Sequence, residues 1–217
     1  WLFAKKNKGK FILRIEDTDL ERSDPKYEKD IIDGLKWLGL EWDEGPVRQS
    51  ERLEIYEKYI NQLLEKKLAY YCFCSKEELE AERQAMLAQG FAPKYSGKCR
   101  ALTEKEVKKK LSAGANHIIR FLVPETTVSF KDLIRGEISF DTALIGDIAI
   151  AKDPRVPLYN FAVVVDDEEM KISHVIRGED HIANTPKQIL IQKALDFCRP
   201  HYAHLPLILD PDRSKMS

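Results

Sequence analysis

The sequence has no long apolar run: none of its 217 residues lies in a stretch long enough for a membrane-spanning helix. It also lacks an excess of charge, with a net charge of -1, so a nucleic-acid partner would have to be held by local patches. Cysteine is scarce at four residues, two of them separated by one residue. This usage fits a reduced, cytoplasmic setting with a metal site better than a disulfide-bonded secreted protein.

No initiator methionine and no targeting segment is present at the start of the sequence. Both ends look cut, so we expect a fragment of a longer protein. The hydrophobic share of 43% and charged share of 33% are ordinary for a globular chain, and the length suffices for one large domain or two modest ones.

An apolar run that begins at Phe11 is followed by three carboxylates, Glu16, Asp17 and Asp19. The run predicts a buried strand, and ligands bind at the C-terminal ends of strands in open α/β sheets. A ligand-binding role and a plain helix cap both remain open for these carboxylates at this point.

The first third of the sequence predicts a helix, the strand from Phe11 and two further helices. Ser23-Asp24-Pro25 is typical of a helix start, and Gly39 of its end. Between them, one helix face carries Tyr27, Ile31, Leu35 and Leu38. A second helix is predicted over 50–67, and it should bury Leu53, Tyr56, Ile60, Leu63 and Leu64.

Periodicity and composition change near Tyr70. The following segment contains two capping boxes, Ser75 to Glu78 and Thr103 to Glu106, each opening a charged helix. Short β-like runs follow at 117–123, 136–140 and 147–151. We interpret residues 71–152 as an inserted α+β domain.

The earlier pattern then resumes. A short strand at 175–176 leads into a polar loop over 177–181, Asn184-Thr185-Pro186 opens a helix, and a strand is predicted over 204–209, with Pro206 near its start or at an edge. Strand, loop, helix and strand predict a doubly wound α/β domain. Residues 161–165 fit a strand or a helix, and Cys198 is expected to be a core residue on the apolar face of the helix that Asn184 opens.

Cys72, Cys74 and Cys99, with Tyr95 four residues before the last, form the clearest constellation. Three thiolates and a phenol oxygen are a plausible tetrahedral zinc set, although tyrosine is an unusual ligand. The alternative is that the cysteines are small buried hydrophobic residues.

Basic residues cluster near these cysteines: Lys94, Lys98, Arg100, Lys108, Lys109 and Lys110, with Lys131 and Arg135 further along. They suit either phosphate binding or a solvated helix face. Arg177, at the end of a predicted strand, is placed to clamp a carboxylate or phosphate with its planar fork. Its alternative is an internal salt bridge to Glu179 or Glu16.

Five motifs together resemble the catalytic core of a bacterial-type glutamyl-tRNA synthetase, a class I aminoacyl-tRNA synthetase. They are Leu13-Arg-Ile-Glu-Asp-Thr-Asp19, Gly45-Pro-Val-Arg-Gln-Ser-Glu51, Tyr159-Asn-Phe-Ala-Val-Val-Val-Asp-Asp167, Val175-Ile-Arg-Gly-Glu-Asp-His181, and Leu205-Pro-Leu-Ile-Leu209 with Ser214-Lys-Met-Ser217. The resemblance implies an α/β fold, a Rossmann-like doubly wound parallel sheet split by an acceptor-stem-binding insertion with a zinc knuckle. The division would be 1–70 and 153–217 for the catalytic domain and 71–152 for the insertion, with 159–167 helical.

The same resemblance implies an enzyme that activates L-glutamate with ATP and Mg²⁺ and transfers it to the 3′-terminal adenosine of tRNA(Glu). By similarity, Glu16 faces the α-ammonium group, Tyr159 and Arg177 hold the side-chain carboxylate, His181 lies near the ATP and amino-acid pocket, and Lys215 begins a phosphate-binding loop. Zn²⁺ would be held by Cys72, Cys74, Tyr95 and Cys99. A cytoplasmic monomer with no membrane partner is expected.

Two departures from the family pattern stand out. The family's His-Ile-Gly-His motif is not among these residues, and neither is the second lysine of the phosphate loop, so we expect this chain alone to be inactive. Two rival functions remain open. One is a paralogue that glutamylates queuosine in a tRNA, and the other is a non-catalytic zinc-braced RNA-binding module.

Overall fold

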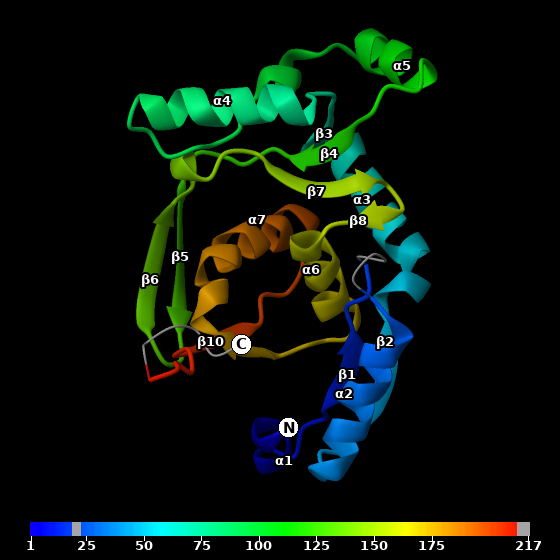
Figure 1. Ribbon diagram of the computed structural model, residues 1–217, viewed down its shortest axis with the longest axis vertical. Coiled ribbons are helices and arrows are strands. Elements are labelled where there is room, and N and C mark those ends of the chain that lie inside the picture. Colours follow the sequence, from blue (N-terminus) through cyan, green and yellow to red (C-terminus); the bar gives the residue numbers. More distant parts are fainter. Residues whose placement is uncertain (19–22, 212–217) are drawn as a thin grey trace. The chain divides into compact units, whose positions relative to one another are not determined.

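The structure is a computed structural model that describes residues 1–18 and 23–211 (Figure 1). Its contacts divide the chain into two compact units, Trp1–Tyr56 and Glu57–Ser217. No helix within the described residues is long and apolar enough to cross a membrane. Asp19 and Lys215, both singled out by the sequence, lie outside the described residues.

The first unit is built on a two-stranded parallel sheet of β1 (Ile12–Ile15) and β2 (Glu44–Arg48), which confirms the strand predicted after Phe11 but not its burial, since all four residues of β1 are half-buried. Helix α1 (Leu2–Lys6) precedes it, and the 3-10 helix η1 (Gln49–Glu51) follows β2. Gly45 has φ +102°, and a Cβ there would lie 2.3 Å from the carbonyl oxygen of Leu13. Only glycine therefore permits the close approach of the two strands at this point.

Helix α2 (Pro25–Trp37) begins as predicted, because the Asp24 side chain accepts a hydrogen bond from the backbone N–H of Lys26. Its expected apolar face is not buried, since Tyr27, Ile31 and Leu38 are 60%, 55% and 61% exposed. A two-stranded sheet offers little apolar surface against which such a face can pack.

Helix α3 (Leu53–Glu65) confirms the second predicted helix. Its inward face is supplied at i, i+4 and i+7 spacing by Tyr56, Ile60 and Leu63, all completely buried. Leu53 and Leu64 are only half-buried. The spacing of apolar residues therefore predicted the buried face of α3 correctly for Tyr56, Ile60 and Leu63.

An antiparallel sheet in the second unit has the order β3–β4–β7–β8, formed by Ala69–Cys72, Ile118–Phe121, Ile148–Asp153 and Val156–Pro157. Helices α4 (Lys76–Ala88) and α5 (Glu104–Ser112) lie between β3 and β4 in the sequence. Both predicted capping boxes are formed, from Ser75 and from Thr103. The 3-10 helix η2 (Lys98–Ala101) connects the two helices.

The other sheet of this unit has the order β6–β5–β10–β9. The hairpin of β5 (Thr127–Asp132) and β6 (Gly136–Asp141) is antiparallel, whereas β10 (His201–Leu205) runs parallel to both β5 and β9 (His174–Gly178). A short 3-10 turn, η3 (Thr142–Leu144), follows the hairpin. The sheet therefore joins strands from both sides of position 152, and the three-part domain division stays a prediction.

Two helices pack side by side in this unit, α6 (Tyr159–Glu169) and α7 (Thr185–Leu195) (Figure 1). The 3-10 helix η4 (Glu179–Asn184) connects β9 to α7. Residues 161–165 are helical and buried, as the family resemblance implies and against the β-propensity of Val163, Val164 and Val165.

Two sequence-based expectations were wrong near the C-terminal end of the chain. The last strand is His201–Leu205 and not 204–209, so Pro206 follows the strand. Cys198 is exposed and not a core residue, because α7 ends at Leu195 and Asp196 adopts a left-handed conformation with φ 60°.

Candidate ligand and metal sites

Arg177 stands near the C-terminal end of β9, where it is held by three polar side chains. Its Nε lies 3.2 Å from Nε2 of His204, and its Nη2 donates to Oγ1 of Thr185 at 2.8 Å and to Oε1 of Gln188 at 2.9 Å. Gln188 in turn donates to Asn160 of α6 at 3.1 Å. The guanidinium is therefore fixed in one orientation by β10, α7 and, through Gln188, α6.

The alternative of a salt bridge from Arg177 to Glu179 is not what the structure shows, since Glu179 pairs with Arg135. Among the residues that the structure describes, none accepts a hydrogen bond from Nη1 of Arg177. Because Nε and Nη2 are already engaged, Nη1 is the part of the guanidinium that is open to an anionic ligand.

Tyr159 and His181 lie together at the starts of α6 and η4. The hydroxyl oxygen of Tyr159 is 3.3 Å from Nδ1 of His181, and Nδ2 of Asn184 is also 3.3 Å from that nitrogen. The carbonyl of His181 accepts from Oγ1 of Thr185 at 3.4 Å, which links the pair to Arg177. The structure thus brings three predicted site residues into one polar cluster, with Tyr159 36% exposed.

The predicted carboxylates after β1 belong to the first compact unit. Glu16 is exposed and lies 3.0 Å from Nη2 of Arg14. Asp17 accepts hydrogen bonds from the backbone N–H and the hydroxyl of Ser50, at 2.9 and 2.6 Å. Asp17 therefore braces the turn at η1, which is a structural role, and Glu16 is the carboxylate that remains accessible.

His204 and Asp132 form a buried pair that the sequence did not predict. Nδ1 of His204 lies 2.6 Å from Oδ2 of Asp132, and both side chains are fully buried. Burial alone would raise the pKa of Asp132, but the backbone N–H of Arg135, the His204 side chain and the backbone N–H groups of Ile134 and His204 outweigh it and lower the pKa to about 2. The available signal was a histidine inside an otherwise buried strand, which requires a polar partner.

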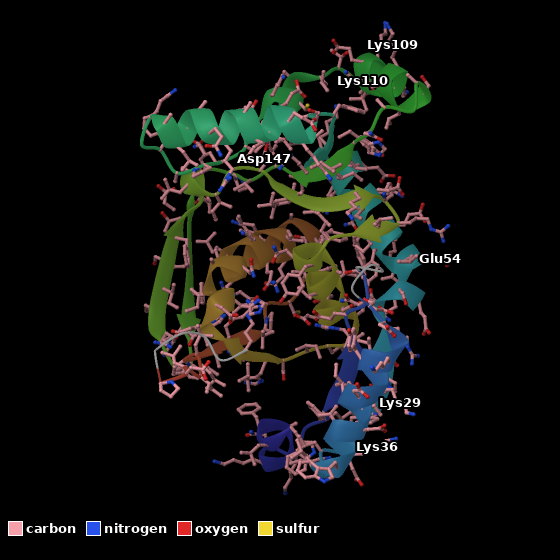
Figure 2. The ribbon with its side chains drawn as sticks, in the orientation of Figure 1. Lys29, Lys36, Glu54, Lys109, Lys110 and Asp147 are labelled. Carbon is pink, nitrogen blue, oxygen red and sulfur yellow. The ribbon has the colours of Figure 1, made fainter. Side chains whose placement is uncertain are left out.

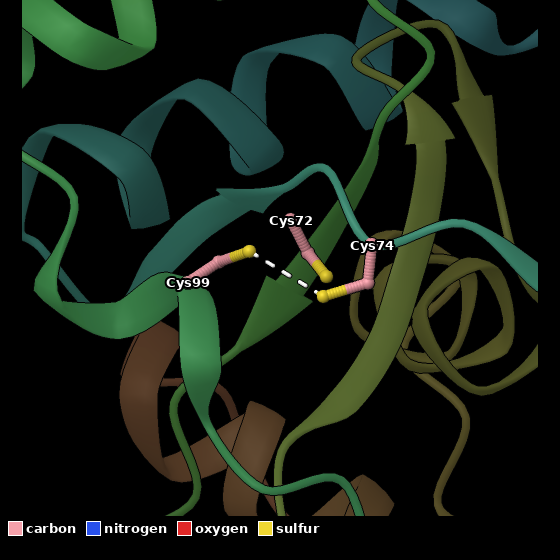
Figure 3. A group of neighbouring side chains, drawn as sticks. All are labelled: Cys72, Cys74 and Cys99. Carbon is pink, nitrogen blue, oxygen red and sulfur yellow. Dashed lines mark hydrogen bonds between the residues drawn. The ribbon is translucent and has the colours of Figure 1, made fainter. Parts of the chain in front are cut away.

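The three predicted cysteine ligands converge at one point (Figure 3). Cys72 ends β3, Cys74 follows it, and Cys99 comes from η2. Their sulfur atoms all lie within 4.8 Å of one another, and those of Cys74 and Cys99 are 3.6 Å apart. Ligands about 2.3 Å from a tetrahedral zinc ion would have sulfur atoms about 3.8 Å apart, so the sulfur positions fit such a site.

Tyr95 adds an oxygen to the same cluster. Its hydroxyl lies 3.3 Å from the sulfur of Cys72 and 3.5 Å from that of Cys74, and it accepts from the backbone N–H of Cys99 at 3.0 Å. The pKa of the Cys74 thiol is raised to about 12, mainly by burial; the hydrogen bond with Tyr95 lowers it, and the sulfur atoms of Cys99 and Cys72 raise it. A cation would offset this penalty, so the donor set of three sulfurs and one oxygen fits zinc.

An ionic network around the buried carboxylate of Asp147 contacts the cluster through Arg120 and Tyr95. The guanidinium of Arg120 lies 3.9 Å from the ring centre of Tyr95 and donates to the carbonyl of Asp147 at 3.0 Å. The completely buried carboxylate of Asp147, labelled in Figure 2, pairs with Arg100 and accepts from Tyr70 and from the backbone N–H of Val123. The network ties η2 to β3, β4 and β7.

The predicted basic patch is smaller than the sequence suggested. Four of its members have internal partners: Lys94 donates to the carbonyl of Ala143, and Lys98, Arg100 and Arg135 pair with carboxylates. Lys108, Lys109 and Lys131 are exposed, and Figure 2 shows Lys109 and Lys110 on α5. Sequence alone cannot separate the two groups, since a lysine looks the same whether or not it is paired.

Strands β9 and β10 run parallel, Arg177 of β9 is hydrogen-bonded to Thr185 of helix α7, and Tyr159 and His181 lie in the same cluster. This arrangement defines an α/β protein of the Rossmann-like class, a class in which the C-terminal ends of the strands are the usual place for a ligand.

The whole chain, residues 1–217, matches the family described as tRNA synthetases class I (E and Q), catalytic domain. The chain belongs to this family, and its fold is that of a class I synthetase catalytic domain.

Relatives and solved structures agree with this membership. The chain is 54% identical to a protein named glutamate–tRNA ligase from Carboxydothermus hydrogenoformans and 54% identical to glutamate–tRNA ligase 1 from Caldicellulosiruptor saccharolyticus, over all of this chain and 47% of each relative. It superposes with a TM-score of 0.91 on a crystal structure of a glutamate tRNA ligase from Elizabethkingia meningosepticum in complex with its amino acid, at 40% identity over 100% of this chain and 47% of that one. The chain thus spans about half the length of the relatives it matches.

Proposed function

We propose that the full-length protein activates L-glutamate with ATP to glutamyl-adenylate and transfers the glutamyl group to the 3′-terminal adenosine of tRNA(Glu). The observation that carries this proposal is the cluster of Arg177, Tyr159 and His181 at the end of β9. The names of the relatives support the same activity.

Each residue has a role that its chemistry suits. Arg177 holds the side-chain carboxylate of glutamate through Nη1, with the hydroxyl of Tyr159 as a second donor. Glu16 faces the α-ammonium group, as an exposed carboxylate can. His181 lies beside ATP and the amino acid, and Lys215, outside the described residues, contacts the phosphates together with Mg²⁺.

Catalysis by this arrangement rests on positioning. Attack of the glutamate α-carboxylate on the α-phosphorus needs no covalent help from the protein, so the site has to align the two reactants and offset the charge that develops on phosphate. A guanidinium already fixed by His204, Thr185 and Gln188 holds the amino acid without having to be ordered at the moment of binding.

For residues 71–152 we propose an inserted domain that binds the acceptor stem of the tRNA. Cys72, Cys74, Cys99 and Tyr95 would hold one Zn²⁺, which would brace β3 against η2 and supply folding energy, with no part in the chemistry. The exposed Lys108 and Lys109 are available to tRNA phosphates.

The test is ATP–pyrophosphate exchange and tRNA charging by the full-length protein. We expect exchange that depends on L-glutamate and attachment of glutamate to tRNA(Glu). The proposal would be contradicted if the full-length protein showed no glutamate-dependent exchange in the presence of tRNA.

A second measurement separates the queuosine-modifying paralogue from the proposed enzyme. Transfer to the terminal adenosine is abolished when that adenosine is removed from the tRNA, whereas glutamylation of queuosine, a different nucleotide, continues. The non-catalytic alternative predicts tRNA binding without exchange. The cluster of Arg177, Tyr159 and His181 argues against that alternative, because an RNA-binding module does not need a site for an amino acid.

A further inference from the structure

Asp132 and His204 are ionisable and buried, and the proposed roles above use only one nitrogen of His204 and leave Asp132 without a role. Asp132 is 1% exposed and His204 is completely buried. Asp132 ends β5 and lies opposite Tyr202 of the neighbouring β10, the strand that carries His204. The short contact of 2.6 Å between Oδ2 of Asp132 and Nδ1 of His204 joins the two strands.

The other ring nitrogen of His204 determines where its proton sits. Nε2 lies 3.2 Å from Nε of Arg177, and a guanidinium can only donate hydrogen bonds. Nε2 must therefore be an acceptor, so the imidazole is neutral and carries its proton on Nδ1, which donates to Asp132. Oγ1 of Thr185 also lies 3.2 Å from Nε2, but its one proton is donated to the carbonyl of His181, so the tautomer is assigned from the contact with Arg177.

The carboxylate of Asp132 is itself fixed in orientation. Its Oδ1 accepts from the backbone N–H groups of Ile134 and Arg135, each at 2.9 Å, and from that of His204 at 3.3 Å. Oδ1 thus accepts three hydrogen bonds from the backbone, and Oδ2 accepts the hydrogen bond from the imidazole. The carboxylate cannot turn over without breaking the tight turn after β5.

We propose that Asp132 and His204 are positioning residues for Arg177: Asp132 holds the imidazole proton on Nδ1, so that Nε2 accepts from Arg177 and aims the free end of the guanidinium at the side-chain carboxylate of the amino acid. The proposal rests on the proposed function, in which Arg177 reads that carboxylate. It makes Asp132, at the end of β5, a residue that affects specificity for the amino acid without contacting it.

The substitution Asp132→Asn tests this chain of hydrogen bonds with almost no change of shape. The three backbone donors require the amide oxygen at the Oδ1 position, which places the NH₂ group against Nδ1 of His204. Nδ1 then has to accept, the imidazole proton moves to Nε2, and two N–H groups face each other at the contact with Arg177. The guanidinium loses its support and shifts.

Two readouts in the full-length protein follow this shift. Nitrogen NMR of histidine-labelled protein, with His204→Gln to assign the signal, should show His204 protonated on Nδ1 in wild type and on Nε2 in Asp132→Asn. The KM for glutamate should rise by about 10- to 100-fold, with the KM for ATP nearly unchanged, because one hydrogen bond to a charged group is lost at the amino-acid site.

Asp141→Asn is the matched control on the same hairpin. Asp141 caps η3 by accepting from the backbone N–H of Ala143 at 2.9 Å, which an asparagine oxygen can also do. We expect this variant to keep the wild-type KM for glutamate and the wild-type signal of His204.

Wild-type protein with His204 protonated on Nε2, or on both nitrogens, would overturn the proposal even if Asp132→Asn did not fold. So would an Asp132→Asn enzyme that changes tautomer and keeps its KM for glutamate. If instead Arg177→Ala leaves glutamate binding intact, the proposed role of Arg177 fails, whatever the state of His204. The two failures are thereby distinguishable.

Discussion

The hydroxyl of Tyr95 lies 3.3 Å from the sulfur of Cys72, although the two residues are 23 positions apart in the sequence. This contact places an oxygen among the three cysteine sulfurs and gives the cluster four donors. Three sulfurs and an oxygen at these separations suit a tetrahedral ion better than a set of packed apolar thiols.

The first prediction is therefore one zinc ion per chain in protein purified without chelator, measured by metal analysis. Cys99→Ser should lose the metal and lower the melting temperature, because metal binding and local folding share one free energy. Cys198→Ser is the control, since Cys198 is exposed and outside the cluster. Stoichiometric zinc in Tyr95→Phe would show that the fourth ligand is not Tyr95.

The second prediction concerns Asp147, whose carboxylate is completely buried among Arg100, Tyr70 and the backbone N–H of Val123. Asp147→Asn leaves Arg100 without its charged partner and should cost about 2 to 3 kcal/mol of stability, near the lower end because Arg100 is 43% exposed. Urea unfolding measures this cost.

Asp153→Asn provides the comparison for Asp147. It makes the same change of chemistry at an exposed carboxylate that accepts only from the backbone N–H of Arg155 among its described contacts. Equal unfolding free energies for the two variants would mean that the buried network contributes no more than a surface turn.

Local signals in the sequence predicted local structure well. The capping boxes at Ser75 and Thr103 formed, and the face of Tyr56, Ile60 and Leu63 was buried, because each depends on residues within one or two helical turns. Cys198 was misplaced because the end of α7 at Leu195 carries no glycine or proline, and Asp196 takes the left-handed conformation instead.

The partners of the site residues could not be read from the sequence. Arg177 contacts Thr185 and Gln188, which the sequence marks only as helix residues, and His204, whose place depends on the pairing of β9 with β10. The sequence identifies the residue that carries the charge. Its hydrogen-bond partners depend on tertiary packing that no local pattern encodes.

The third prediction is a pH dependence. The pKa of Asp132 is lowered from 3.8 to about 2 in the folded protein. A lowered carboxyl pKa stabilises the fold above the unfolded value, and that contribution is lost as the pH falls through the folded value. A pKa lowered from 3.8 to about 2 corresponds to about 2 kcal/mol of stability at pH 7.

Thermal unfolding of wild type and Asp132→Asn between pH 7 and pH 3 measures this contribution. We expect Asp132→Asn to melt at a lower temperature at pH 7 and the difference to shrink below about pH 4. Asp141→Asn should show no such convergence. A difference that stays constant down to pH 3 would mean that Asp132 contributes through its shape and not through its charge.

The last prediction concerns the choice between glutamate and glutamine in the full-length protein. Glutamine presents a neutral amide to Arg177, whose Nη1 then loses a charge-assisted partner. The loss should cost about 2 to 5 kcal/mol, or about 30-fold to several thousand-fold in discrimination. Arg177→Lys keeps the charge without the planar group that His204 and Thr185 orient, so it should weaken glutamate activation strongly. Arg177→Ala should weaken it further and narrow the gap between the two amino acids.

Glu16→Gln tests recognition of the α-ammonium group separately from recognition of the side-chain carboxylate. Because the α-ammonium group is common to glutamate and glutamine, this variant should weaken both to the same extent and leave their ratio unchanged. Pyrophosphate exchange with glutamate and with glutamine, by the wild type and the three variants, measures the preference of each enzyme for glutamate. An Arg177→Ala enzyme that prefers glutamate by the wild-type margin would mean that another residue reads the carboxylate. The neutral contacts of Arg177 to Thr185 and Gln188 would then serve only to join β9 to α7.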